Sequence, residues 1–200
     1  MSRKRAAGVA GAAVAIGLVL SGCSSASPGA AAVVGEQRIS ERELTAQVEE
    51  VLRAQGRPAD SSSQALVATT LDRMITTSLI DQLAQSEGFE VSQGELDATL
   101  AMYEEASGGK EALEQALLGQ DLAPDDIPEI IRVNILAQKI GMALDPAGSP
   151  DAQSAAVFEA VTAYSNAVGT TVSPRYGTWD STSLAVAGTP DDLSIPVPIS

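Results

Sequence analysis

The chain has 200 residues and a formal net charge of −14 at pH 7, an excess of acid that repels nucleic-acid phosphates and argues against nucleic acid as a partner. It contains no histidine, and its one cysteine is Cys23, so we expect no disulfide, no histidine-activated nucleophile and no zinc site of the usual kind. We therefore expect no catalytic residues, no metal and no cofactor, since an enzyme would have to rely on carboxylate, lysine or tyrosine chemistry.

Residues 1–22 are expected to be a lipoprotein signal peptide. The basic tripeptide Arg3-Lys4-Arg5 precedes an apolar run over residues 6–20, and the run leads into Leu20-Ser21-Gly22-Cys23. This tetrapeptide resembles the box of bacterial lipoproteins in which acyl chains such as palmitate are attached to the cysteine. The alternative is a membrane-spanning helix, which needs ~20 apolar residues. We predict that Cys23 is lipidated and holds the chain at the extracytoplasmic face of the cell membrane.

A flexible tether is expected over residues 23–30, which are small and turn-prone. The folded domain is then expected to span residues 31–180. It begins with the apolar residues 31–34, which predict a strand that ends at Gly35.

Two Ser-x-x-Glu patterns, at residues 40–43 and 92–95, each lie between apolar residues, as in a capping box with a hydrophobic staple. They predict helices over residues 40–55 and 92–106. Between them, residues 64–87 carry a wide apolar face, which suits a helix packed by neighbours on more than one side.

A short helix is predicted over residues 110–118, followed by a longer one over 124–144. The longer helix is apolar around most of its circumference, so we expect it to lie at the centre of the fold. Asn134 and Gln138 interrupt its apolar side one turn apart. We interpret them as core amides with satisfied hydrogen bonds, and alternatively as amides that line a groove.

The carboxy-terminal part is predicted to contain a last helix over residues 151–168 and a short strand over 170–172. Trp179 is expected to hold this returning segment in place. Residues 181–200 are rich in Ser, Thr, Pro, Gly and Asp, and we predict that they form a disordered tail.

Four segments together resemble one family. Residues 34–44 (VGEQRISEREL) resemble the opening of the SurA-type extracytoplasmic chaperones, which have relatives among PrsA lipoproteins and the chaperone lobe of trigger factor. The likeness continues at residues 91–96 and 130–140, and residues 172–180 resemble the strand that returns to pair with the first one. The resemblance implies a mainly α, SurA N-terminal-like helical domain with a small two-stranded pairing of its N- and C-terminal segments.

One departure from the family concerns activity. In SurA and PrsA a parvulin prolyl-isomerase domain is inserted between the long helix and the returning segment, whereas here that place is the short link over residues 145–150. Parvulin sites also commonly carry histidines, which this chain lacks. We therefore expect no prolyl-isomerase activity.

The main hypothesis is a lipid-anchored chaperone-like protein that holds unfolded or partly folded exported polypeptides. The alternative is an envelope scaffold lipoprotein that binds one specific folded partner. If there is a client-binding surface, the residues that we expect there are Met102, Tyr103, Asn134, Gln138 and Met142. For Met74, Met102 and Met142, packing in the core is the simpler interpretation.

Acid pairs offer a third hypothesis, an acid-based hydrolase. The pairs Glu49-Glu50, Glu104-Glu105 and Asp125-Asp126 could supply two carboxylates for glycoside chemistry. Adjacent residues on a helix point in different directions, however, so we interpret these pairs as solvated faces.

Overall fold

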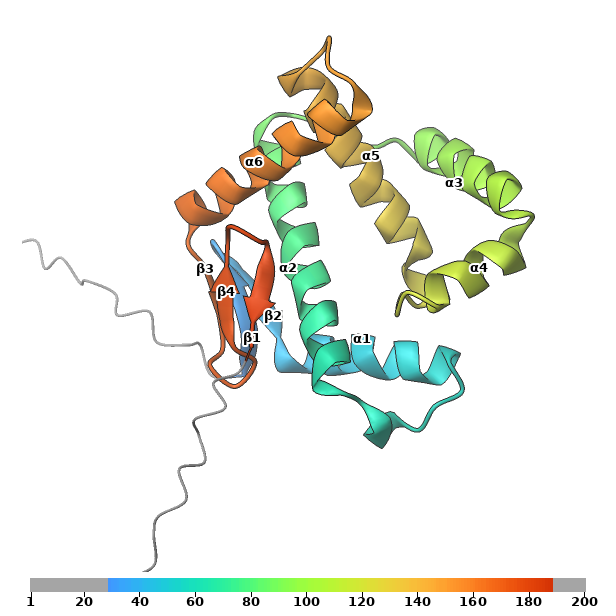
Figure 1. The fold of residues 1–200 in the computed structure, drawn as a ribbon, viewed down its shortest axis with the longest axis vertical. Coiled ribbons are helices and arrows are strands. Elements are labelled where there is room, and N and C mark those ends of the chain that lie inside the picture. The colour runs from blue at the N-terminus through green and yellow to red at the C-terminus, as the bar shows by residue number, and fades with distance from the viewer. Residues whose placement is uncertain (1–28, 189–200) are drawn as a thin grey trace, which may run out of the picture.

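The N-terminal strands meet a strand that follows the last helix in a small antiparallel sheet (Figure 1). The computed structural model describes residues 29–188, in which β1 (Ala30–Val34) lies between β2 (Gln37–Ser40) and β3 (Thr170–Val172). Val33 of β1 is paired with Thr171 of β3. The predicted pairing of the N- and C-terminal segments is therefore confirmed.

The sheet has one strand more than the sequence predicts. β2 pairs with β1 through the two-residue turn Gly35-Glu36, in which Gly35 has a φ of +61°. A type II′ hairpin turn favours glycine at this first position. Only Ile39 of β2 is buried, so the strand has too little apolar character to be recognised from its own residues.

Several predictions concern residues that the structure does not describe. The signal peptide at 1–22, Cys23, and the tether up to residue 28 lie outside the described residues. Ala30, assigned to the tether, instead belongs to β1 and is buried, so the strand begins one residue earlier than predicted. None of the helices in the described part of the chain has the length and apolar character needed to cross a membrane.

Helices make up most of the described part of the chain, which confirms the predicted fold class. The two capping boxes form as expected; in the first, Glu43 N donates to Ser40 Oγ at 3.2 Å, and the Glu43 carboxylate accepts from Ser40 N at 2.7 Å. The helices are α1 (Glu41–Ala54), α2 (Gln64–Ser86), α3 (Gln93–Ser107), α4 (Lys110–Leu118), α5 (Ile127–Leu144) and α6 (Pro150–Val168), with short 3-10 helices η1 (Ala59–Ser61) and η2 (Pro124–Asp126).

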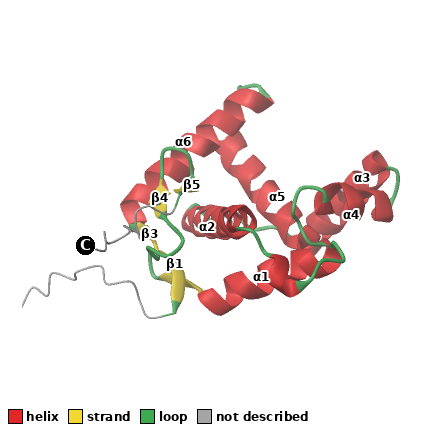
Figure 2. Cartoon of the chain, turned by 60° about the horizontal axis from the view of Figure 1, so that its bottom comes forward, coloured by secondary structure: helices red, strands yellow, loops and turns green. Residues whose placement is uncertain are grey.

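The helix at the centre is α2, whereas the sequence led us to expect the helix over residues 124–144 there. Figure 2 shows α2 end-on, surrounded by α1, α5, α6 and the strands. Leu71, Ile75 and Leu79 of α2 are each fully buried. The wide apolar face of this helix is explained by neighbours on several sides, as predicted.

The apolar circumference of α5 has a different cause. Val133, Leu136 and Ile140 on one side pack into the main core with α1, α2 and β1. Residues on another side pack with α3 and α4 into a second, smaller core, which contains Leu113, Ile127, Ile131 and Ile135. α5 is thus apolar on nearly all sides because it connects two cores.

The C-terminal segment is ordered beyond the point that the sequence predicts. β4 (Thr178–Asp180) and β5 (Ala185–Ala187) form a second antiparallel sheet, so the prediction of disorder is wrong for residues 181–188. Val186 N donates to Asp72 Oδ1 of α2 at 2.6 Å, and Trp179 Nε1 donates to Ser165 Oγ of α6 at 2.9 Å. These contacts attach β4 and β5 to the helices. The remaining predicted tail, 189–200, lies outside the described residues.

Candidate functional site

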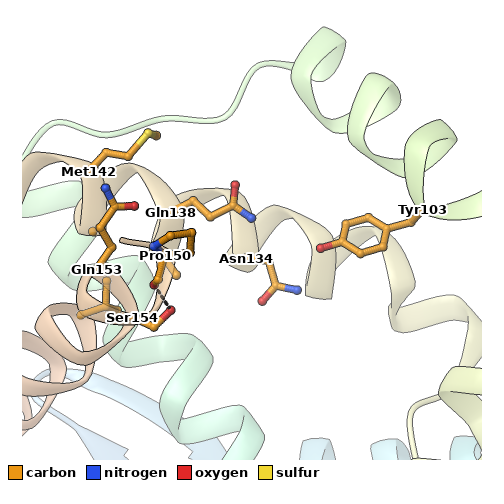
Figure 3. A pocket seen from close by; sticks show the side chains of 10 residues that line it. Tyr103, Asn134, Gln138, Met142, Pro150, Gln153 and Ser154 are labelled. Atoms are coloured by element: carbon orange, nitrogen blue, oxygen red, sulfur yellow. Dashed lines mark hydrogen bonds between the residues drawn. The ribbon is translucent and has the colours of Figure 1, made fainter. Parts of the chain in front are cut away.

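A groove of about 640 Å³ lies where α3, α5 and α6 face one another, and we call it the uncharged groove (Figure 3). One wall comes from α5 and another from the first turns of α6, and Tyr103 projects from α3 on the opposite side. None of its lining residues is charged; they are Tyr103, Asn134, Ala137, Gln138, Gly141, Met142, Pro150, Gln153, Ser154 and Val157.

Helical spacing explains how the walls form. The α5 residues lie at positions 134, 137, 138, 141 and 142, and the α6 residues at 150, 153, 154 and 157, so each set follows one helix face. Gly141 lets the two helices approach closely. A Cβ added there would lie 3.2 Å from both Gln153 Cβ and Val157 Cγ2, so the absent side chain makes room for α6.

The two amides of α5 point into the groove rather than into the core. Asn134 and Gln138 are both exposed, and the structure assigns their side chains no hydrogen bond within the described residues. The interpretation as satisfied core amides is therefore wrong, and the groove-lining alternative is correct. On α6, Gln153 Nε2 donates to the Asp145 carbonyl at 3.0 Å, and Ser154 Oγ donates to the Pro150 carbonyl at 2.9 Å.

The methionines divide between core and surface. Met74 packs against the main core, as predicted, whereas Met142 is 51% exposed at the groove and Met102 is 57% exposed. The core interpretation is therefore wrong for Met102 and Met142. Met102 lies on α3 but is not among the residues that line the groove.

Of the predicted client-binding set, the structure thus gathers Tyr103, Asn134, Gln138 and Met142 around one groove. The α6 wall of the groove was not predicted from the sequence. Its signal is the spacing of Pro150, Gln153, Ser154 and Val157, which places neutral polar and apolar side chains on one helix face.

Ion pairs connect α5 to α3 and to α2. Lys139 Nζ lies 2.7 Å from Glu95 Oε1 and donates to the Glu90 carbonyl at 2.6 Å. The Lys139 ammonium, together with the Ser92 capping contacts, lowers the pKa of Glu95 to about 2. Arg132 binds Asp81 of α2 and Glu129 of its own helix, and its guanidinium lowers the pKa of Glu129.

Carboxylates from two of the predicted acid pairs meet elsewhere in the fold. Glu50 of α1 lies close to Asp125 of η2; burial first, and then the interaction with Asp125, raise the pKa of Glu50. Within residues 29–188, no group of three or more acidic residues is arranged to hold a metal ion.

Comparison with known protein families gives a match. A family model described as a SurA-like N-terminal domain matches residues 2–141. The match includes β1, β2, α1 to α4 and most of α5, and it ends before α6, which forms one wall of the groove. No curated protein and no solved structure matches the chain.

Proposed function

The chain belongs to the family of SurA-like N-terminal domains, a chaperone-type family, and from this membership we propose that it holds unfolded or partly folded exported polypeptides in the uncharged groove. The observation that carries the proposal is the placement of Asn134 and Gln138. Both are exposed in a concave surface, one helical turn apart, and neither is bonded within the described residues.

Amide side chains suit an extended polypeptide as a ligand. Each offers both a donor and an acceptor, so it can bind a backbone carbonyl and a backbone N–H whatever the sequence of the ligand. Met142 and Val157 supply apolar contacts beside the amides, and methionine adapts to side chains of different shape. This combination supports broad binding of unfolded chains rather than recognition of one sequence.

Lipid anchoring at the extracytoplasmic face of the membrane is part of the proposal. It is supported by the basic, apolar and Leu-Ser-Gly-Cys segments that end at Cys23. Gly29, the first described residue, is six positions further on, so an extended tether would keep the domain within ~20 Å of the lipid. We further propose that the protein acts by binding alone, without prolyl-isomerase activity.

The test is to dilute a denatured model enzyme from guanidinium into buffer with the purified full chain, and to follow aggregation by light scattering. We expect slower aggregation and no acceleration of prolyl isomerisation in a peptide assay. Protection of no unfolded enzyme, with capture of a single folded envelope protein, would overturn the proposal in favour of the scaffold alternative.

A second measurement locates the binding surface. A photo-reactive residue in place of Gln138 is expected to crosslink to the unfolded enzyme. The matched control is the same residue in place of Asn166, which is exposed near the end of α6 and lines no part of the groove. Equal crosslinking from both positions would remove the groove from the proposal.

A further inference from the structure

A second concave surface lies beside the N-terminal end of α5. It has a volume of about 350 Å³ and is bounded by α3, α4, η2 and the start of α5. Its floor is apolar, formed by Leu100, Leu113 and Ile127, of which Leu113 and Ile127 are buried in the second core. Because the floor belongs to a packed core, we expect this pocket to keep its shape.

The rim of the pocket carries unbalanced negative charge. Glu104, Glu114 and Asp125 line it, against one basic residue, Lys110. Lys110 Nζ lies 3.7 Å from Glu114 Oε1, at the long end of an ion pair, and its side chain is 68% exposed. The rim therefore has more carboxylates than cations to pair with them, and we call this site the acidic pocket.

The surroundings of Asp125 also carry an excess of negative charge. Asp125 lies close to Glu50, and after burial their interaction is the next cause of the raised pKa of Glu50. Two cations near these carboxylates are already paired, because Arg73 lies 3.1 Å from Asp126 and Arg53 lies 3.6 Å from Glu50. A further positive charge near Asp125 would reduce the repulsion among these carboxylates.

We propose that the acidic pocket binds an apolar polypeptide segment that carries lysine or arginine, with its apolar side chain on the floor and its cation beside Glu104, Glu114 and Asp125. The inference rests on the proposed function in taking a polypeptide as the ligand. It goes further because it assigns a charge preference to a site separate from the uncharged groove. Complementary charge also accelerates capture of such a segment by this acidic chain.

The test measures binding of three fluorescent Leu/Ala peptides to the purified full chain by anisotropy, where the peptides differ only in carrying two lysines, two glutamines or two glutamates. At low salt we expect the lysine peptide to bind about fivefold more tightly than the glutamine peptide, as several weak ion pairs would give. This preference is expected to shrink as salt screens the charges.

Two triple variants test whether the preference for the lysine peptide arises in the acidic pocket. The substitutions Glu104→Gln, Glu114→Gln and Asp125→Asn together are expected to abolish it. The control, Asp97→Asn, Glu105→Gln and Glu111→Gln, removes the same charge from exposed positions of α3 and α4 outside the pocket, and is expected to retain most of it. Thermal melting of both variants checks that they are folded.

The possible results separate this inference from the proposed function. Equal binding of the lysine and glutamine peptides overturns the inference but leaves the holding of unfolded chains intact. The preference for the lysine peptide could also survive in the pocket variant, or be lost equally in the control variant. Either result would show that the preference comes from the overall charge of the chain, and would overturn the inference. If only the lysine peptide binds, and unfolded enzymes are not protected, the acidic pocket stands and the holding function fails.

Discussion

Lys139 Nζ of α5 lies 2.7 Å from Glu95 Oε1 at the start of α3, and the same carboxylate completes the capping box with Ser92. One acid therefore performs two tasks: it caps its own helix and attaches that helix to α5. Tyr103, two turns further along α3, faces the uncharged groove, so this contact helps to set the position of the groove wall.

The stability of this attachment is expected to depend on pH. The pKa of Glu95 is lowered from 4.5 to about 2 in the folded chain, so its contribution is complete above 4.5 and is lost as the pH falls towards 2. Glu95→Gln keeps a side chain that can form a capping box but removes the charge. The melting temperature of the native chain should exceed that of the variant at neutral pH, and the difference should vanish near pH 2. A difference that is constant over this range would contradict the assignment.

Gly141→Ala is expected to destabilise the fold by about 1 kcal/mol, because overpacking at the α5–α6 contact outweighs the gain in helix propensity. The new Cβ would lie 3.2 Å from Gln153 Cβ and Val157 Cγ2. Gly94→Ala is the matched control, since nothing lies within 4 Å of its added Cβ, and it should stabilise α3 by up to about 1 kcal/mol. Urea denaturation measures both. Stabilisation by both variants would show that α5 and α6 do not need a glycine at this contact.

Ser165→Ala is expected to cost about 1–3 kcal/mol by leaving Trp179 Nε1 without its partner. Ser165 is 1% exposed, and its Oγ accepts from Trp179 Nε1 at 2.9 Å and donates to Thr170 Oγ1 at 2.9 Å. Trp179 is the only tryptophan in the sequence, so its fluorescence reports directly on this contact. In a double-mutant cycle with Trp179→Phe, we expect the two losses to be less than additive. Full additivity would mean that the hydrogen bond contributes nothing to stability.

Cys23→Ser is expected to abolish lipid attachment, because Cys23 is the only thiol in the sequence and ends the Leu-Ser-Gly-Cys box. Mass spectrometry of the native protein should find acyl chains on Cys23, and detergent phase partitioning should recover the native chain with the detergent. The variant should be unacylated. An unmodified Cys23 in the native host would refute the lipoprotein hypothesis.

Local signals in the sequence explain why the helices could be predicted. Ser40, Ser92 and the glycines that end the helices act through neighbours three to five residues away, so these patterns can be read without the tertiary structure. β2 could not be found in this way, because it is defined by pairing with β1 rather than by its own apolar residues. The hairpin of β4 and β5 likewise depends on distant partners, Asp72 and Ser165.

The uncharged groove could likewise be predicted only in part from the sequence. Periodicity places Asn134 and Gln138 on one side of α5, but it does not say whether that side meets a core or open space. The answer depends on α6, which packs against α5 at Gly141 and leaves these amides exposed. The convergence of Glu50 and Asp125 is also invisible in sequence, since 75 positions separate them along the chain and tertiary packing brings them together.

The position of β1 has a mechanical consequence. Any pull transmitted through Gly29 reaches the fold at the middle strand of the three-stranded sheet, which is hydrogen-bonded to β2 on one side and β3 on the other. Two ladders therefore share the load, and the backbone bonds from Glu41 N to the Gly29 carbonyl and from Ser173 N to the Ala31 carbonyl reinforce both sides. A domain held at its N-terminal end can thus bear tension from a bound chain without peeling off a single edge strand.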